Sequence, residues 1–230
     1  MNMIKKIVII GAGGFGREVK WLIERINKEY EKKTGKPEWK IEGFIDDGDM
    51  ESTIAGIPVL GNTEILKKWD KPLSVVCAIG NSETRKMIIQ KIMSNHNIDF
   101  PNLVDPSAII SEHVKMGKGN IICAGNIMTV DIEITDFAIL NLDCTVGHDV
   151  EMESYVTIYP SVNISGCIKI GACSEIGTGS HIIQSKEIGP HTIIGAGAVV
   201  VKDVPGYSVS VGNPAKVIKS RVLICCLLYT

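Results

Sequence analysis

The chain has 230 residues, enough for one large or two small domains with proper cores, and its formal net charge of −2 gives no electrostatic basis for binding nucleic acid. Its 7 cysteines are scattered without C-x-x-C spacing, which favours reduced thiols in a cytoplasmic protein over a disulfide framework or a zinc site. No run of about 18 apolar residues occurs, and the first residues run directly into a strand pattern, so we expect neither a membrane span nor a signal peptide.

The first 100 residues carry an alternation of strand and helix patterns. The first helix places apolar residues from Val19 to Ile26 on one face, and Asn81 or Ser82 caps the second. The predicted elements are strands over 4–10, 39–47, 57–61 (a short edge strand) and 73–81, and helices over 14–33 and 82–95. This order is typical of a parallel sheet with right-handed crossovers.

A glycine turn joins the first strand to the first helix. In "GAGGFG", Gly11, Gly13 and Gly16 have the G-x-G-x-x-G spacing that usually indicates a dinucleotide cofactor. A full dinucleotide fold, however, needs two mononucleotide halves with about six strands, whereas only four strands are predicted in the first 100 residues. The acids Asp46 and Asp47 also lie much farther along the chain from Gly11 than the usual spacing of about 20 residues. We therefore expect the turn to hold the phosphate of a different nucleotide ligand.

A period of six replaces the helical period after residue 103. Seventeen consecutive positions spaced six apart are aliphatic or Met. These positions are Val104, Ile110, Met116, Ile122, Met128, Ile134, Leu140, Val146, Met152, Ile158, Ile164, Ile170, Ile176, Ile182, Ile188, Ile194 and Val200. A hexapeptide repeat predicts a parallel β-helix, because three hexads close a triangular coil. Seventeen hexads make between five and six coils, whereas a β-sandwich would not keep this register.

Among the 5 histidines, His148 has the surroundings that suit catalysis. Gly147 leaves the corner uncrowded, and the Asp149 carboxylate can accept an imidazole N–H, fix the tautomer and raise the basicity of the ring. Gly166 comes three hexads later and is expected one coil above, where its backbone N–H can serve as an oxyanion donor. A base and an oxyanion donor on either side of a carbonyl are what acyl transfer requires.

These motifs resemble the sugar acyltransferases of the sialic-acid O-acetyltransferase type, and in particular the bacterial enzymes that N-acetylate nucleotide-linked 4-amino sugars. The resemblance covers residues 4–220 and rests on the order and spacing of its segments. The segments are "GAGGFGRE", "FIDD", "IPVLG", "AIGN", "NLDCTVGHDV", "SGCIKIGACSEIGTGS", "IIGAGAVVVKDVP" and "VGNPAKVIK".

The resemblance implies a small Rossmann-like α/β domain (1–102) for a nucleotide-sugar, followed by a left-handed β-helix domain (103–220) for acetyl transfer, and a tail (221–230) of unknown role. The β-helix would bind acetyl-CoA between neighbouring subunits of a homotrimer. The implied protein is a cytoplasmic acetyltransferase of surface-glycan biosynthesis whose partner is a UDP-, GDP- or dTDP-linked 4-amino-4,6-dideoxy sugar. No metal, nucleic acid or membrane is expected.

The resemblance also assigns site residues. His148 matches the general base of a direct transfer, and Asp149 matches the acid that orients it. The further assignments are substrate contacts at Gly13, Gly14, Phe15, Asp46, Asp47, Gly80, Asn81, Asn141 and Thr157, and acetyl-CoA contacts at Gly166, Thr178 and Ala196. Cys144 and Cys167 lie near His148 in sequence, but we expect them to be small packed residues rather than nucleophiles.

Three alternatives stay open at this point. O-acetylation of sialic acid or a related sugar hydroxyl would use the same His–Asp pair. A metal hydratase on the same kind of helix needs three histidines that converge on zinc, and the sequence has no H-x4-H pair. A non-catalytic β-helix scaffold would need neither the Gly-His-Asp corner nor the glycine one coil above it.

Overall fold

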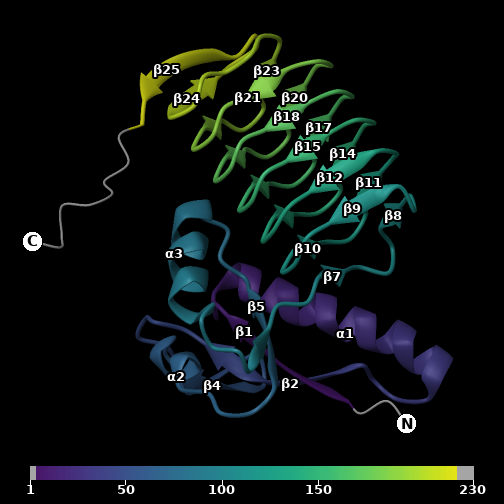
Figure 1. The fold of residues 1–230 in the computed structure, drawn as a ribbon, viewed down its shortest axis with the longest axis vertical. Coiled ribbons are helices and arrows are strands. Elements are labelled where there is room, and N and C mark those ends of the chain that lie inside the picture. The colour runs from purple at the N-terminus through teal and green to yellow at the C-terminus, as the bar shows by residue number, and fades with distance from the viewer. Residues whose placement is uncertain (1–3, 222–230) are drawn as a thin grey trace, which may run out of the picture.

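The computed structural model describes residues 4–221, and residues 222–230 of the predicted tail lie outside the described residues. An α/β half is followed by a parallel β-helix, so the predicted fold class is confirmed (Figure 1). Within residues 4–221, none of the helices has the length and apolar character needed to cross a bilayer.

The N-terminal half is built on one six-stranded sheet in the order β3-β4-β2-β1-β5-β6, in which only the β3–β4 pair is antiparallel. Its elements are β1 (Lys5–Ile10), α1 (Gly14–Thr34), β2 (Trp39–Ile45), β3 (Thr53–Ile54), β4 (Ile57–Gly61), α2 (Glu64–Lys67), β5 (Leu73–Cys77), α3 (Ser82–Ile92) and β6 (Ile98–Asp99). The predicted strands and helices are confirmed in order and place, but β2, β5 and α3 end at Ile45, Cys77 and Ile92, before the predicted residues 47, 81 and 95. Residues 78–81 lead from β5 into α3, which the Asn81 side chain caps by accepting a hydrogen bond from the Thr84 N–H.

The β-helix has five complete coils and part of a sixth, and each coil gives one strand to each of three faces. Paired strands are three hexads, or one coil, apart, as in Ile121 beside Ile139. The first face holds β7 (Leu103–Val104), β10 (Ile121–Ile122), β13 (Ile139–Leu140), β16 (Thr157–Ile158), β19 (Glu175–Ile176), β22 (Ile193–Ile194), β24 (Ser208–Val211) and β25 (Lys216–Ser220). The second face holds β8 (Ile109–Ile110), β11 (Ile127–Met128), β14 (Thr145–Val146), β17 (Asn163–Ile164), β20 (His181–Ile182) and β23 (Val199–Val200). The third face holds β9 (Val114–Met116), β12 (Ile132–Ile134), β15 (Glu151–Met152), β18 (Lys169–Ile170) and β21 (Glu187–Ile188).

The period-six residues form the core of the β-helix. Fourteen of the seventeen are buried in one cluster, and the other three, Val104, Ile110 and Met116, are partly buried against it. These three belong to the first coil, which has a neighbouring coil on one side only. Burial of each Ile or Val side chain stabilises the fold by about 1.5–3 kcal/mol relative to an exposed one. The column of period-six residues therefore stabilises the stacked coils.

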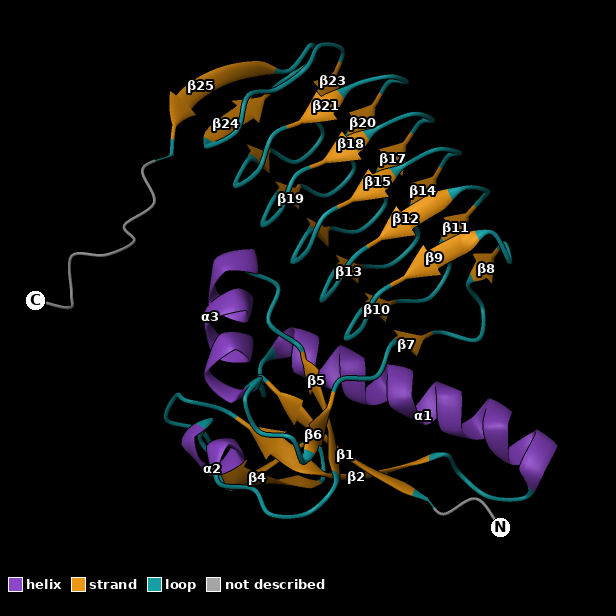
Figure 2. Ribbon diagram, viewed as in Figure 1, coloured by secondary structure: helices purple, strands orange, loops and turns teal. Residues whose placement is uncertain are grey.

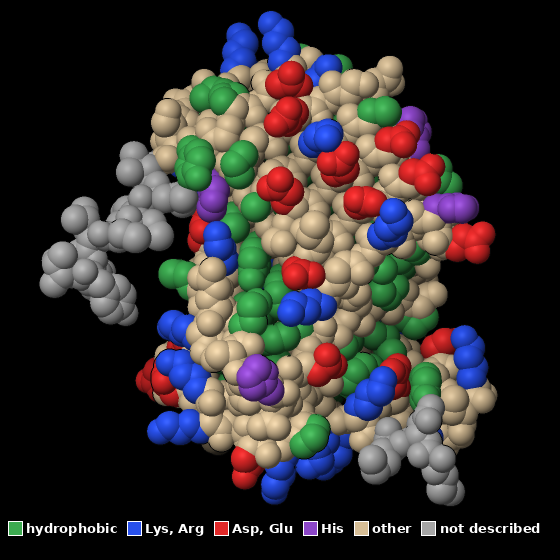
Figure 3. Space-filling view, in the orientation of Figure 1, with side chains coloured by type: hydrophobic (Ala, Val, Ile, Leu, Met, Phe, Trp, Pro, Cys, Tyr) green, Lys and Arg blue, Asp and Glu red, His purple; other side chains and the backbone are tan. Residues whose placement is uncertain are grey.

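The two halves pack through the first face of the β-helix. Leu103, Ile121 and Ile139 share a core cluster with Leu22 and Ile23 of α1, which runs beneath the first coils (Figure 2). Across the same junction, Arg25 donates to both carboxylate oxygens of Asp105, at 2.6 and 3.0 Å. On the side seen in Figure 3, acidic and basic side chains are interspersed over the β-helix.

Candidate active site

The glycine turn at the start of α1 combines a tight bend with open space. Gly11 has a φ of +96°, and a Cβ there would lie 2.7 Å from Ile79 Cδ1. A Cβ on Gly16 would lie 1.9 Å from the Gly11 carbonyl oxygen, so this glycine allows α1 to pack on the turn. Nothing lies within 4 Å of a Cβ on Gly13, which is the N-cap of α1 and provides no side-chain cap. The first N–H groups of α1 are therefore available to an anion such as phosphate.

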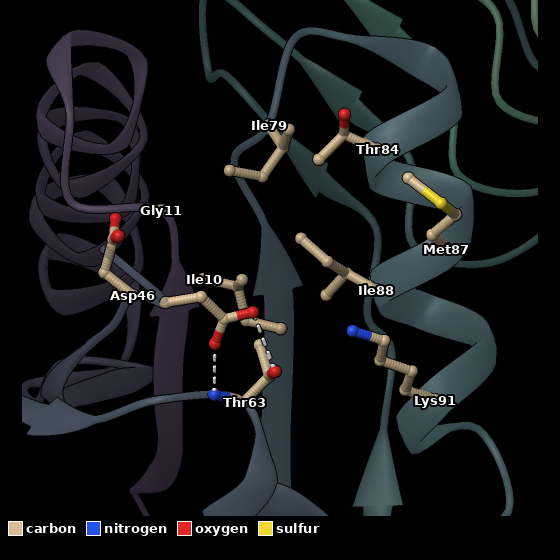
Figure 4. Close-up of a pocket in the computed structure, with 10 residues that line it drawn as sticks. Ile10, Gly11, Asp46, Thr63, Ile79, Thr84, Met87, Ile88 and Lys91 are labelled. Carbon is tan, nitrogen blue, oxygen red and sulfur yellow. Dashed lines mark hydrogen bonds between the residues drawn. The ribbon is translucent and has the colours of Figure 1, made fainter. Parts of the chain in front are cut away.

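A cavity of about 290 Å³ lies beside this turn, at the carboxyl ends of the central strands (Figure 4). Asp46 accepts a hydrogen bond from the Ala12 N–H at 2.8 Å, and Asp47 accepts from the Thr63 N–H and hydroxyl at 2.7 and 3.0 Å. The lining residues are Ile10, Gly11, Asp46, Asp47, Thr63, Ile79, Thr84, Met87, Ile88 and Lys91. The two predicted acids thus line one mostly apolar pocket, at the place where crevices of parallel α/β sheets bind ligands.

The other predicted substrate contacts of the N-terminal half do not line this cavity. Gly13 and Gly14 lie at the start of α1, and Phe15 is half-buried against the core cluster under that helix. The Gly80 carbonyl accepts a hydrogen bond from the Thr157 hydroxyl at 2.7 Å, and Asn81 caps α3. Substrate contacts at these positions stay predictions.

The structure brings His148 and Asp149 together. His148 Nδ1 lies 2.7 Å from Asp149 Oδ2, and each side chain is about 60% exposed. Asp149 has a φ of +58°, the left-handed conformation that Asp tolerates better than most residues. With Nδ1–H directed to the carboxylate, the neutral imidazole keeps Nε2 as a free acceptor.

Two stacked glycines leave room for this imidazole. A Cβ on Gly166 would lie 2.5 Å from both Cε1 and Nε2 of His148, and a Cβ on Gly147 would lie 2.8 Å from the Gly166 nitrogen. The Cys167 N–H donates to the His148 carbonyl at 2.8 Å, which fixes the two coils against each other. Among the hydrogen bonds of residues 4–221, the Gly166 N–H donates none, so it is available to an oxyanion.

The remaining predicted contacts lie on a different edge of the β-helix. His148 and Gly166 follow second-face strands, and we call this edge, between the second and third faces, the His148 edge. Asn141, Thr178 and Ala196 follow first-face strands and lie on the edge between the first and second faces, the Asn141 edge. One chain therefore carries the two sets of predicted residues at opposite ends of its second face.

Thr157 lies with neither set. It is 1% exposed on the first face, and its hydroxyl donates to Gly80 and accepts from Arg85 Nη2 at 2.9 Å. Its hydroxyl is thus engaged between the two halves, and a contact between Thr157 and the sugar stays a prediction.

The cysteines near His148 differ from each other. Cys144 is buried as expected, and burial raises the pKa of its thiol to about 11. The expectation of a packed residue is wrong for Cys167, which is exposed with its Sγ 4.0 Å from Asp149 Oδ2. Cys167 follows Asp149 by one coil and shares its outward corner, with the same φ of 58°.

Two groups of side chains within residues 4–221 have the composition to hold a metal. One is His148, Asp149 and Cys167, and the other is Glu83, Cys173 and His191. In the second group, burial raises the pKa of the Cys173 thiol to about 11. Glu83 already hydrogen-bonds His191 Nδ1. The absence of a metal, expected from the sequence, stays a prediction for both groups.

A buried polar network between the halves was not predicted from the sequence. Arg85 is 1% exposed and Glu175 is 7% exposed. Glu175 Oε1 accepts from the Ser82 N–H and hydroxyl at 3.0 and 2.9 Å. The sequence did carry a signal: Thr157 and Glu175 are polar residues at outward strand positions of the first face, where the earlier coils carry Leu103, Ile121 and Ile139.

Comparison with known proteins gives consistent relatives over nearly the whole chain. Residues 6–92 match the family described as the PglD N-terminal domain. GDP-perosamine N-acetyltransferase of Escherichia coli O157:H7 is 30% identical over 217 residues, which cover 92% of this chain and 95% of that protein.

Two solved structures share both halves. The acetyltransferase domain of PglB from Neisseria gonorrhoeae FA1090, in complex with acetyl coenzyme A, superposes with a TM-score of 0.81 and 31% identity over 93% of this chain and 99% of that one. PerB from Caulobacter crescentus, in complex with CoA and GDP-perosamine, gives a TM-score of 0.77 and 28% identity over 94% of this chain and 99% of that one. The resemblance drawn from the motifs is confirmed.

Proposed function

Since the chain belongs to the family of sugar N-acetyltransferases that includes GDP-perosamine N-acetyltransferase, we propose that it transfers the acetyl group of acetyl-CoA to the 4-amino group of a nucleotide-linked 4-amino-4,6-dideoxy sugar. The observation that carries this function is the His148–Asp149 pair with Gly166 stacked against the ring. We assign nucleotide-sugar binding to residues 1–102 and acetyl transfer to residues 103–220.

The chemistry follows from the free Nε2 of His148. This nitrogen accepts a proton from the sugar amine as the amine nitrogen attacks the thioester carbon, while Asp149 stabilises the resulting imidazolium. The C–N bond forms, the carbonyl oxygen becomes an oxyanion beside the Gly166 N–H, and the C–S bond then breaks. His148 returns the proton to the CoA thiolate, so no covalent intermediate with the protein is needed.

The division of residues between two edges supports a homotrimer. In one chain, the His148 edge and the Asn141 edge lie at opposite ends of the second face, and the nucleotide pocket adjoins the first face. If three second faces surround a threefold axis, the His148 edge of one copy meets the Asn141 edge of the next. Ile109 and Ile127 on this face are 65% and 40% exposed, as expected for a surface that another copy covers.

In this arrangement acetyl-CoA binds between copies, and Gly166 of one copy faces Thr178 and Ala196 of its neighbour. The nucleotide-sugar bound by one chain then reaches His148 of the neighbouring chain. The cysteines within residues 4–221 are free thiols, which supports the expected reducing, cytoplasmic location. Surface-glycan biosynthesis is the pathway class that uses such amino sugars.

The test is an acetyl-acceptor panel with purified protein. GDP-, UDP- and dTDP-linked 4-amino-4,6-dideoxy sugars are compared with free and CMP-linked sialic acid, and thiol release from acetyl-CoA is measured together with the mass of the product. We expect one nucleotide-linked amino sugar to gain a single N-acetyl group. Turnover of sialic acid alone would support O-acetylation instead. If the protein binds CoA but acetylates none of these acceptors, the proposal that it is a sugar acetyltransferase is contradicted.

A further inference from the structure

Arg85 is a buried cation that joins the two halves of the chain. Its Nε donates to the Phe137 carbonyl at 3.0 Å, and its Nη2 donates to the Tyr155 carbonyl at 2.8 Å and to the Thr157 hydroxyl at 2.9 Å. These acceptors belong to consecutive coils of the β-helix. Burial lowers the pKa of the guanidinium, but arginine stays charged in proteins.

The other guanidinium nitrogen of Arg85 holds the loop between β5 and α3. Nη1 donates to the Ile79 carbonyl at 2.6 Å and to the Gly80 carbonyl at 3.0 Å. Ile79 lines the nucleotide cavity, and so do Thr84 and Lys91 from α3. One planar group thus connects a wall of the nucleotide pocket with the coils of the β-helix.

Glu175 holds the same wall from the next coil. Besides both donors of Ser82, its Oε1 accepts from Asn81 Nδ2 at 3.1 Å, and its Oε2 accepts from the Tyr159 hydroxyl at 3.2 Å. Tyr159 follows Asn141 by one coil on the Asn141 edge, and a Cβ on Gly80 would lie 3.7 Å from the Tyr159 hydroxyl. The pocket wall is therefore bonded to the edge that, in the proposed trimer, faces His148 of the neighbouring copy.

We infer that Arg85, with Glu175, is a positioning residue that fixes the nucleotide-pocket wall on the Asn141 edge and so sets where the sugar amine meets His148. This inference rests on the proposed function. It concerns the placement of the bound substrate rather than its affinity, because Arg85 does not itself line the cavity and bonds the wall only through the backbone carbonyls of Ile79 and Gly80. Lysine cannot replace arginine here, since a single ammonium cannot donate to both sides of the junction in the planar pattern of a guanidinium.

The experiment compares Arg85→Lys with Arg25→Lys in the full chain. Arg25 also forms a bidentate contact between the halves, with Asp105, but it lies away from the pocket wall, so it controls for loss of an arginine at the junction. For each variant, kcat with saturating nucleotide-linked amino sugar, the Kd for the matching nucleoside diphosphate and the melting temperature are measured.

For Arg85→Lys we expect kcat to fall about 10²-fold, the cost of a misplacement of about 1 Å, with the nucleoside diphosphate Kd within about threefold of wild type. Arg25→Lys should leave kcat within about threefold and change only the melting temperature. If Arg85→Lys does not fold, Glu175→Gln is expected to show the same loss of kcat with retained diphosphate binding.

If wild type is active, two outcomes overturn the role of Arg85 alone. In the first, the Arg85→Lys variant folds and keeps the wild-type kcat; in the second, its affinity for the nucleoside diphosphate falls as much as its kcat. A wild type that turns over no nucleotide-linked amino sugar overturns the proposed function, and this role with it.

Discussion

Replacing Gly166 by alanine tests the contact between this glycine and the His148 imidazole. The added Cβ would lie 2.5 Å from Cε1 and Nε2 of the ring, whereas favourable carbon contacts lie at about 3.5–4.0 Å. The ring must therefore retreat by about 1 Å. Because the His148 side chain is 60% exposed, it can do so by rotating into solvent, and that rotation breaks the hydrogen bond to Asp149.

We expect kcat of Gly166→Ala to fall about 10²-fold, because a misplacement of about 1 Å in a reacting group has that cost. The free energy of unfolding should stay within about 0.5 kcal/mol of wild type, since an exposed side chain absorbs the clash. Alanine keeps the backbone N–H, so the loss of activity would come from the displaced base and not from a lost oxyanion donor.

The assay is steady-state thiol release from acetyl-CoA, together with thermal melting, in a double-mutant cycle with His148→Ala. In the His148→Ala background, Gly166→Ala should cause no further loss, because the ring that it displaces is already absent. A Gly166→Ala variant with wild-type kcat would refute the reasoning. An equal loss from Gly166→Ala with and without the imidazole would refute it as well.

Three further predictions concern neighbouring groups. Asp149→Asn should lower kcat about 10²-fold in the same assay with little change in the KM for acetyl-CoA, because the amide no longer favours the tautomer with a free Nε2; an unchanged kcat would contradict the orienting role. Cys144→Ser and Cys167→Ser should keep kcat within about threefold, because the transfer uses no thiol nucleophile; a loss as large as that of Asp149→Asn in either serine variant would point to an acyl-cysteine. Burial raises the pKa of Asp105, but the hydrogen bonds from Arg25 and Ser107 outweigh it and hold the pKa below its ordinary value. The Asp105 carboxylate therefore stabilises the fold above its unfolded-state pKa of about 4, and this stability is lost as the pH falls through the lower folded value. In denaturant melts, the free energy of unfolding of Asp105→Asn should be about 1–2 kcal/mol below that of wild type at neutral pH, and it should change less as the pH falls. The same dependence on pH in acid for both proteins would contradict this.

The β-helix could be predicted because the same packing requirement recurs in every coil. Every coil needs one inward aliphatic side chain per face, so an error at one position leaves the other positions of the ladder intact. The α/β half was predictable only in its longer elements. β3, α2 and β6 have between two and four residues, too few for a period to be recognised, and their positions depend on pairing and packing with the rest of the half.

The same repeat made part of the site predictable. His148 and Gly166 are three hexads apart, which is one coil, so they are predicted to stack directly on each other. The structure confirms this stacking. Stepping one coil onward from Asp149 would also have placed Cys167 on an exposed corner. Arg85 and Glu175 could not be found in this way. Their partners across the junction between the two halves lie between 52 and 94 residues away, and no local pattern specifies how the halves dock.

The most direct test of the central claim is the kcat/KM of His148→Ala for the nucleotide-linked amino sugar that wild type accepts, measured beside His113→Ala. His113 is a second exposed histidine of the β-helix, with its side chain 60% exposed, and it lies two coils before Asp149 on the same edge. The loss of a general base predicts a fall of about 10²–10⁴-fold for His148→Ala with retained binding of CoA, and none for His113→Ala. A His148→Ala variant with near-wild-type kcat/KM would contradict the account.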